Sequence, residues 1–199
     1  MQATIHNEFL TLTVDTHGAE AVSLKNAAGE ELLWQADPAV WKRHAPILFP
    51  WTGKLPGGTF EVDGKTYKGG QHGFARDMEH TLLKAEGDTI QLELRSDDAI
   101  KAERFPFDFV LTSTFRLDGK TVHHTLTVRN PLAPKSCALA SAITRRSTSP
   151  LMPQHTHHGL RVPVRPAGKP GHSGCPSERP AVWQVLLSVE EPAGHPADG

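Results

Sequence analysis

One short segment of the chain collects side chains that could do acid–base chemistry. His72, Arg76 and Asp77 lie within six residues, directly after the pair Gly69-Gly70. A histidine titrates near neutral pH and can pass a proton, whereas a guanidinium presents a planar fork of donors to oxygen atoms. Loops carried by a rigid scaffold are the usual place for such sites. The alternative is a solvent-facing turn in which His72 and Arg76 do no chemistry.

Two other patterns lack the spacing that their chemistry requires. The pair Gly53-Lys54 has neither the spacing of a phosphate-binding loop nor a helix after it. Histidines and a cysteine also gather in the C-terminal part, but without the paired spacing of a zinc site, and prolines interrupt them throughout. We therefore predict no metal site and no cofactor. The C-terminal residues concerned are His155, His157, His158, His172 and Cys175.

The segments that would position the loop are predicted to be strands. Leu10, Leu12 and Val14 alternate with threonines, which is the period of a half-buried strand. No convincing helix start is visible, and short strands separated by frequent turns favour an all-β sandwich or barrel. The predicted hairpins span 60–67, 82–94 and 110–128, with turns at Asp63-Gly64, Glu86-Gly87-Asp88 and Asp118-Gly119.

Overall composition excludes several classes of protein. The chain has 199 residues, 38% of them hydrophobic, and a formal net charge of −1. This balance argues against a nucleic-acid partner bound through its phosphates. No apolar run is long enough to cross a membrane, and the first residues lack the pattern of a signal peptide, so we expect no membrane partner and a cytoplasmic location. Cys137 and Cys175 could form one bridge at most, which is no disulfide framework.

Composition changes abruptly near residue 130. Residues 1–130 hold all eight phenylalanines, five prolines, 14 basic and 18 acidic residues. Residues 131–199 hold no phenylalanine, eleven prolines, seven basic and four acidic residues. Such a break usually marks a domain followed by a linker or an irregular tail.

Several motifs occur in the order and at the spacing of one known family. They are Pro46-Ile-Leu-Phe-Pro50, Gly53-Lys54-Leu55, the predicted hairpin 60–67, Gln71-His72-Gly-Phe-Ala-Arg-Asp77 and Phe105-Pro-Phe-Asp-Phe109. Together they resemble the aldose 1-epimerase (galactose mutarotase-like) family, above all its LacX-type branch, over about residues 3–130. The His-Gly-Phe-Ala-Arg stretch is the specific part of the resemblance.

The resemblance implies a large β-sandwich with a sugar cleft and an isomerase that interconverts the α and β anomers of free sugars. In that chemistry a carboxylate takes the proton of the anomeric hydroxyl and an imidazolium gives a proton to the ring oxygen. The ring opens to the aldehyde, rotates and recloses. The implied partner is a small-molecule sugar, an aldohexose. A hexose-6-phosphate 1-epimerase stays open as an alternative, because that branch also carries His-Gly-Phe-Ala-Arg.

The resemblance also implies roles for four residues. His72 matches the first of two family histidines near the ring oxygen and is the predicted catalytic residue, with Lys54, Gln71 and Arg76 as predicted substrate-binding residues. Relatives usually carry arginine where this chain has Lys54, and lysine keeps the charge but loses the planar fork. In the family the first histidine is usually a supporting contact, and the second, in a later Gly-x-His-Pro-Ala-Phe motif, is usually assigned the acid. This second histidine and the still later glutamate base are absent from this chain.

A shifted reading frame accounts for the missing motifs. From Ser136 to Pro150, the third base of each codon can be combined with the first two bases of the next. The codon table then permits Leu-Arg-Phe-Ser-Phe-Gly-x-His-Pro-Ala-Phe-Asn-Val-Pro, which is what a relative would have here. We therefore interpret residues 1–130 as the N-terminal part of an epimerase-like sandwich and residues 131–199 as an irregular tail produced by a frameshift.

Three functional hypotheses follow from the sequence, and the first of them is the predicted function, with the other two as alternatives. The chain is a sugar isomerase impaired by the loss of its later motifs, a carbohydrate-binding sandwich without turnover, or an inactive fragment. The identity of the sugar, the general base and the oligomeric state are not predicted. The tail is expected to be weakly packed, with 183–189 as its one strand-like stretch.

Overall fold

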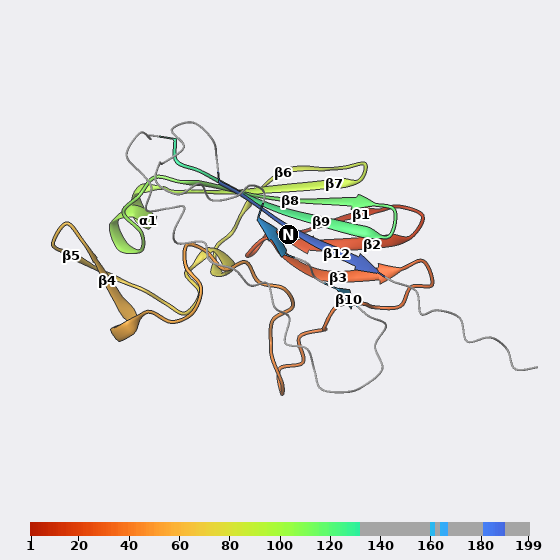
Figure 1. Cartoon of the computed structure of the whole chain (residues 1–199), viewed down its shortest axis with the longest axis horizontal. Helices are drawn as coiled ribbons and strands as arrows, with labels where there is room; N and C mark the ends of the chain where they lie inside the picture. The colour runs from red at the N-terminus through yellow and green to blue at the C-terminus, as the bar shows by residue number, and fades with distance from the viewer. Residues whose placement is uncertain (132–159, 162–163, 167–180, 190–199) are drawn as a thin grey trace, which may run out of the picture.

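Antiparallel sheets make up nearly all of the regular structure, as expected from the sequence. The computed structural model describes residues 1–131, 160–161, 164–166 and 181–189. One sheet has the strand order β1-β2-β3, with β1 at Gln2–His6, β2 at Leu10–Asp15 and β3 at Glu20–Asn26. It lies beside the larger sheet in Figure 1, and β1 contacts strands β6 and β7 of that sheet.

The larger sheet has seven strands in the order β10-β12-β9-β8-β7-β6, with β11 paired to β12. All of its described pairs are antiparallel. Its strands are β6 (Thr81–Glu86), β7 (Thr89–Arg95), β8 (Val110–Asp118), β9 (Thr121–Arg129), β10 (Leu160–Arg161), β11 (Val164–Pro166) and β12 (Ala181–Val189). A separate hairpin of β4 (Thr59–Val62) and β5 (Lys65–Lys68) extends at one end of the molecule (Figure 1).

Alternating side chains build the core between the sheets. Along β2, Leu10, Leu12 and Val14 are buried while the residues between them are half-buried, which confirms the predicted period of two. On the larger sheet, β7 and β8 repeat the pattern and bury one face of each strand. The buried residues of these two strands are Ile90, Leu92, Leu94, Val110, Leu111, Ser113, Phe115 and Leu117.

The predicted hairpins are present, and their turn residues explain their geometry. Asp63 and Gly64 both have positive φ, at 50° and 77°, as a primed turn of type I′ requires. Strands β6 and β7 form the hairpin predicted at 82–94. In the long hairpin the predicted turn is off by one residue, because Asp118 pairs with Thr121 and the two-residue loop is 119–120. Only Gly119 of that loop has positive φ, which fits a type II′ turn.

The prediction that the chain has no helix start is wrong. A short α-helix, α1, spans Asp98–Glu103. Asp97 precedes it as the N-cap, and its side chain accepts a hydrogen bond of 2.7 Å from the amide of Ile100. The signal was in the sequence, because aspartate is a favoured N-cap residue. Ile100 is the residue that α1 buries. No helix in the described part of the chain is long and apolar enough to cross a membrane.

Most of the predicted irregular tail lies outside the described residues, and so do Cys137, Cys175 and the C-terminal histidines. The described tail residues form β10, β11 and β12. Strand β12 includes the strand-like stretch singled out at 183–189 and pairs with β9 from Ala181 opposite Val128 to Ser188 opposite Thr121. Among the described residues, β12 therefore covers the hydrogen-bonding edge that β9 would otherwise present.

A cluster of phenylalanines closes one end of the core. The Phe49 ring lies 4.9 Å from Phe109 and 6.2 Å from Phe74, centroid to centroid, and Phe105 packs beside all three. All four are buried. Tilted and edge-to-face pairs of this kind add to the free energy gained from burial alone. Because Phe49 and Phe74 belong to the two loops singled out by their sequence, the cluster attaches those loops to the sandwich.

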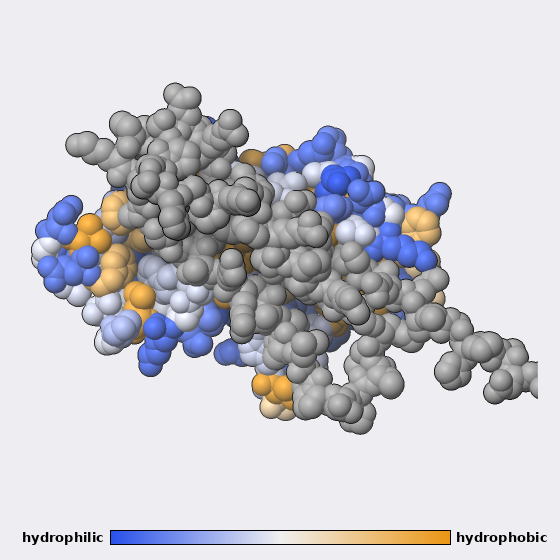
Figure 2. Space-filling model, viewed as in Figure 1, coloured by the Kyte–Doolittle hydropathy of each residue, from blue (hydrophilic) through white to orange (hydrophobic). Residues whose placement is uncertain are grey.

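Aromatic packing continues from this cluster to the β4–β5 hairpin. Trp51 contacts Phe60 at 5.4 Å, and Phe60 stacks on Tyr67 at 5.4 Å. The ammonium of Lys65 lies 5.0 Å from the centre of the Tyr67 ring. In Figure 2 the end that carries this hairpin shows hydrophobic residues among hydrophilic ones. The hairpin is therefore held by side chains, since β4 and β5 pair only with each other among the described strands.

Removing a ring from the cluster should cost much stability. We expect Phe109→Ala to lower the free energy of unfolding by about 3–5 kcal/mol, because it leaves a cavity among three other rings. The matched control is Phe9→Ala, which removes a ring that is 39% exposed and over which the Lys120 ammonium lies at 5.6 Å. Urea unfolding followed by tryptophan fluorescence measures both variants. Equal losses would contradict the placement of the core.

A histidine on the core face of the larger sheet makes stability depend on pH. His124 stacks on Phe115 with ring centroids 3.9 Å apart, and its Nε2 lies 2.9 Å from the hydroxyl of Ser113. Burial of the imidazole lowers the pKa of His124 to about 4, from an ordinary value of 6.5. The unfolded chain therefore binds a proton at this residue between these two values, whereas the folded chain does not.

Folding should consequently weaken as the pH falls from about 6.5 to 4. Within this window each pH unit can cost up to about 1.4 kcal/mol at one such histidine. We expect His124→Gln, which has no titrating group but can still bond Ser113, to lose less stability over the window than the unchanged chain does. Urea midpoints at pH 7 and pH 5 give the comparison. If the unchanged chain and His124→Gln lose equal stability between pH 7 and pH 5, His124 is not the cause of the pH dependence.

Candidate functional site

Two loops that are far apart in sequence meet through their backbones. Phe49 and Gly73 form an isolated parallel bridge. The carbonyl of Phe49 accepts hydrogen bonds from the amides of Phe74, at 2.8 Å, and Ala75, at 3.3 Å. The 3₁₀ turn η2 (Ala75–Asp77) follows at once, with Ala75 buried. The segment Gln71–Asp77 is therefore fixed against the 49–54 loop before any side chain is considered.

This approach of the loops depends on a glycine. Gly73 has φ of +72°, and a Cβ built on it would lie 1.9 Å from the carbonyl oxygen of Phe49 and 2.6 Å from the nitrogen of Pro50. No side chain fits at such distances, and the backbone conformation itself disfavours every residue but glycine. The Gly in His-Gly-Phe-Ala-Arg is thus required by the contact between the loops.

His72 is bound to Gly53 by a reciprocal pair of hydrogen bonds. The amide of His72 donates to the carbonyl of Gly53 at 2.8 Å, and the amide of Gly53 donates to Nδ1 of the His72 ring at 2.8 Å. His72 has φ of +66°, which is unusual for a residue with a Cβ, and Gly53 has φ of +83°. His72 is half-buried and lies outside the hydrophobic core. Its pKa is lowered, first by burial and then by the nearby charge of Arg76.

The other predicted site residues lie on the same two loops with different exposure. Lys54 follows Gly53 directly and is exposed. Gln71 is exposed, and its amide lies 3.3 Å from Nε2 of His72. Trp51 bridges the loops as well, since its indole N–H donates to the carbonyl of Gly70 at 2.9 Å. The structure therefore joins Gln71 and His72 to the loop that carries Lys54, while the functional roles of these residues stay predictions.

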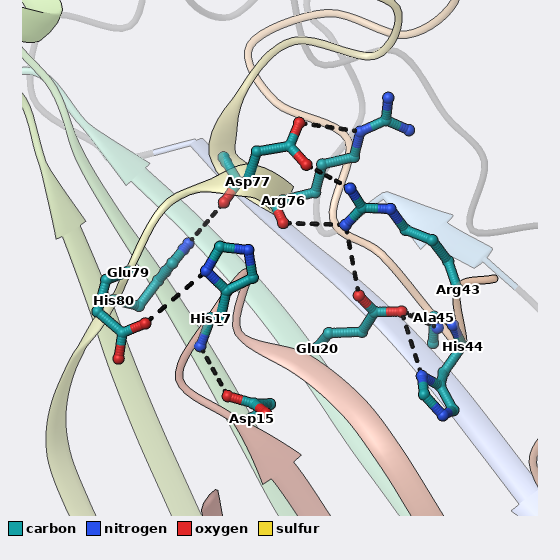
Figure 3. A network of polar contacts seen from close by, with 11 residues as sticks. Asp15, His17, Glu20, Arg43, His44, Ala45, Arg76, Asp77, Glu79 and His80 are labelled. Atoms are coloured by element: carbon teal, nitrogen blue, oxygen red, sulfur yellow. Dashed lines mark hydrogen bonds and ion pairs between the residues drawn. The ribbon is translucent and has the colours of Figure 1, made fainter. Parts of the chain in front are cut away.

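Arg76 lies on η2, beside a network of charged residues that the sequence analysis did not identify (Figure 3). Arg43 donates to the carbonyl of Arg76 at 3.1 Å and forms an ion pair with Asp77. Its other neighbour is Glu20, at 3.8 Å. The carboxylate of Glu20 is buried and accepts from the amides of His44, at 2.6 Å, and Ala45, at 2.9 Å. The network ties β3, the 43–45 segment and η2 to one another.

Within this network the Arg76 side chain keeps part of its donor set unused. Its Nε lies 3.6 Å from a carboxylate oxygen of Asp77 and, buried as it is, has no hydrogen-bond partner among the described residues. The two terminal nitrogens point away from Arg43 and make no contact with the other residues drawn in Figure 3. Asp77, by contrast, is shared between two guanidinium groups. Arg76 can therefore still donate to an oxygen-rich ligand.

A second group of polar residues fixes the far end of η2. Glu79 accepts a hydrogen bond of 2.5 Å from the hydroxyl of Thr16, and its other oxygen lies 3.9 Å from Nδ1 of His17. His80 is buried, and its Nε2 bonds to the carbonyl of Ala75 at 3.0 Å. The pKa of His80 is lowered, chiefly by burial. These contacts hold η2 in place from the side of the β2–β3 connection.

Sequence reasoning missed Gly53, Glu20 and Arg43 as residues that shape the site. In the sequence, Gly53 stands out only as part of an excluded phosphate loop and of the Gly53-Lys54-Leu55 motif. Its real partner, His72, is 19 residues away, and short-range pattern cannot show that pairing. Glu20 and Arg43 reach Arg76 and Asp77 only through the fold. The sequence predicts no metal site. In the described part of the chain, no group of three or more histidine, cysteine, aspartate or glutamate residues is placed so that it could hold a metal ion.

Comparison with known proteins identifies the family. The model of the aldose 1-epimerase family matches residues 1–142, so the chain belongs to this family. This match contains both loops and the polar network described above.

Individual relatives agree with this assignment over the same part of the chain. Two curated proteins called LacX from Lactococcus lactis, one chromosomal and one plasmid-borne, are each 31% identical over 135 residues, which is 65% of this chain and 45% of theirs. A galactose mutarotase related enzyme from Lactobacillus acidophilus is 35% identical with a TM-score of 0.63, covering 65% of this chain and 43% of that one. A galactose mutarotase-like protein from Lactobacillus casei is 32% identical with a TM-score of 0.59, covering 66% and 46%. The chain thus spans about half the length of the relatives it matches.

The contact at Gly73 can be tested with a matched pair of glycines. Gly29 also has positive φ, at +83°, but a Cβ there would meet nothing within 4 Å. We expect Gly29→Ala to cost only the backbone strain, roughly 1–2 kcal/mol. Gly73→Ala should cost the same strain and at least about 2 kcal/mol more from overpacking against Phe49. Urea unfolding measures both, and similar losses would refute the close approach of the two loops.

Proposed function

We propose that this chain binds a free sugar at the His72–Arg76 loop and is an aldose 1-epimerase-type isomerase that turns over poorly. The observation that supports the proposal most is the fixed imidazole of His72, set by the amide of Gly53, with unused donors of Arg76 on the same short segment. A sugar offers many acceptor oxygens in a small volume. Two rigidly placed donors on one loop match that chemistry.

Turnover needs more than these donors. One group must take the proton of the anomeric hydroxyl while another protonates the ring oxygen, so that the bond from C1 to the ring oxygen breaks and the aldehyde forms. Rotation about the C1–C2 bond and the reverse steps then give the other anomer. Each well-placed acid or base contributes about 10²–10⁴ in rate.

The carboxylates nearest the loop are all engaged in structural contacts. Glu20 accepts from two amides, Asp77 is shared by Arg43 and Arg76, and Glu79 bonds Thr16. Glu61 is exposed on the β4–β5 hairpin. Among the described residues there is therefore no carboxylate poised as a base beside His72. This supports sugar binding with weak turnover, and it favours the carbohydrate-binding hypothesis as the second candidate.

Two measurements test the proposal on the chain as it exists. Polarimetry of freshly dissolved α-glucose and α-galactose should show little acceleration by this chain. It should show strong acceleration by a version in which one inserted or deleted base restores the His-Pro-Ala-Phe motif. Glucose 6-phosphate, compared in the same way, tests the phosphorylated alternative. Equal acceleration by both versions would refute the frameshift and the assignment of catalytic groups together.

Binding separates a sugar site from an inert fragment. We expect Arg76→Gln to weaken sugar binding by about ten-fold or more, since a hydrogen bond from a charged group contributes about 1.5–3 kcal/mol. The control is Arg104→Gln, which removes an exposed arginine at the end of α1. Isothermal titration with galactose or glucose gives both affinities. Equal affinities for Arg76→Gln and Arg104→Gln would remove Arg76 from the site.

A further inference from the structure

We infer that the backbone amide of Gly53 locks His72 in the neutral form protonated at Nε2, so that the ring offers one fixed N–H, at Nε2, to an oxygen of the sugar. The role toward sugar rests on the proposed function, whereas the locked form of the ring does not. Gly53 is thus a positioning residue that acts through its main chain, and the ligand atom that faces Nε2 must carry a lone pair.

The protonation state follows from the direction of one hydrogen bond. An amide N–H can only donate, and the amide of Gly53 points at Nδ1 of His72 from 2.8 Å. Nδ1 must therefore present its lone pair, which leaves Nε2 as the nitrogen that carries the proton in the neutral ring. The reciprocal bond from the His72 amide to the Gly53 carbonyl keeps the two residues in register. Neither bond depends on an exposed side chain.

A positively charged ring would conflict with this arrangement. An imidazolium carries protons on both nitrogens, so its Nδ1–H would face the Gly53 N–H at a distance suited to a hydrogen bond. The charge of Arg76 and the partial burial of the ring act in the same direction. A group that must donate a full proton at neutral pH needs the opposite surroundings, such as a neighbouring carboxylate. His72 is therefore suited to donate a hydrogen bond without giving up its proton.

The backbone conformations of His72, Gly73 and Gly53 allow the hydrogen bonds between His72 and Gly53. His72 adopts φ of +66°, a conformation that costs free energy in a residue with a Cβ. Gly73 lies directly against Phe49, and Gly53 itself needs φ of +83°. The loops thus hold a strained histidine in a single orientation. Strain of this kind persists where the surrounding structure over-determines it, often at ligand-binding sites.

Gln71 completes the description of the ring in the free protein. The structure places its amide nitrogen 3.3 Å from Nε2 of His72. That nitrogen can only donate, so a ring protonated at Nε2 requires the amide of this exposed residue to turn about its last side-chain bond. The amide oxygen of Gln71 then accepts from Nε2.

The locked form of the ring can be observed without any ligand. In the full chain labelled with ¹⁵N at histidine, two-bond ¹H–¹⁵N correlation spectra distinguish the two neutral forms and the charged form. His72→Asn identifies the signal of His72, since asparagine tolerates positive φ. We expect the pattern of a ring protonated at Nε2 alone, unchanged from pH 7.5 to pH 6. A ring protonated at Nδ1, or charged at pH 7, would overturn the inference.

A pair of substitutions tests what the ring does for the sugar. His72→Gln keeps a neutral N–H donor near the place of Nε2, whereas His72→Asn keeps an acceptor for the Gly53 amide but reaches no further. If His72 is a hydrogen-bond donor, His72→Asn should weaken sugar binding ten-fold or more and His72→Gln should stay within about three-fold of the unchanged chain. Urea unfolding checks that both variants are folded. Equal weakening by the two folded variants would overturn the donor role.

The two experiments separate this inference from the proposed function. A ring protonated at Nε2 in a chain that binds no sugar would leave the Gly53–His72 lock standing and refute the proposed function, and with it the donor role. Sugar binding by a chain in which His72 is charged would leave the proposed function standing and refute the Gly53–His72 lock.

Discussion

The approach of two loops to van der Waals contact at Phe49 and Gly73 is the constraint on which the rest of the site depends. The Phe49 carbonyl binds two successive amides of the 74–75 segment, while the Phe49 ring packs into the phenylalanine cluster of the core. One residue thus joins the hydrophobic core to the polar loop. Because this contact is made by the main chain, His72 and Gly53 meet in one register, and the orientation of the imidazole follows from it.

The polar residues around η2 fall into two groups, which are acidic side chains that already have partners and side chains that can still donate hydrogen bonds. The acidic side chains close to the loop are engaged in contacts within the fold. Glu20 accepts from a backbone amide of the 43–45 segment, and Asp77 pairs with two arginines. Glu79 accepts from the hydroxyl of Thr16, the residue that follows β2. The donors of His72 and Arg76 are left facing outward. The loop therefore offers hydrogen-bond donors with no unengaged carboxylate beside them among the described residues, which agrees with the proposed sugar binding and weak turnover.

Membership of the aldose 1-epimerase family and a span of about half its relatives' length fit this division. In the family resemblance, the loop with His72 comes early in the chain, while the second histidine and the glutamate come later. Under the proposed function, the early loop and its supporting strands are the parts that hold the ligand. Strand β12 pairs with β9 along most of its length, so the larger sheet continues beyond the segment that the family shares.

The sequence alone determined the local features, which are the strands, the hairpins and the motif that carries the family resemblance. Alternation at Leu10, Leu12 and Val14 and the turn at Asp63-Gly64 depend on residues a few positions apart, and short-range sterics decide them. The turn predicted at Asp118-Gly119 is off by one residue, and α1 is missed because a capping aspartate and a helix of six residues are too short a segment to show a helical period. The candidate site itself could be found only as a list of residue types. That Gly53 faces His72, that Arg43 joins Glu20 to Asp77, and that the nearby carboxylates are engaged are all pairings over 19 to 63 positions of sequence. Only the tertiary structure decided them, since such pairings arise from the packing of the two loops on the phenylalanine cluster and leave no periodic trace in the chain.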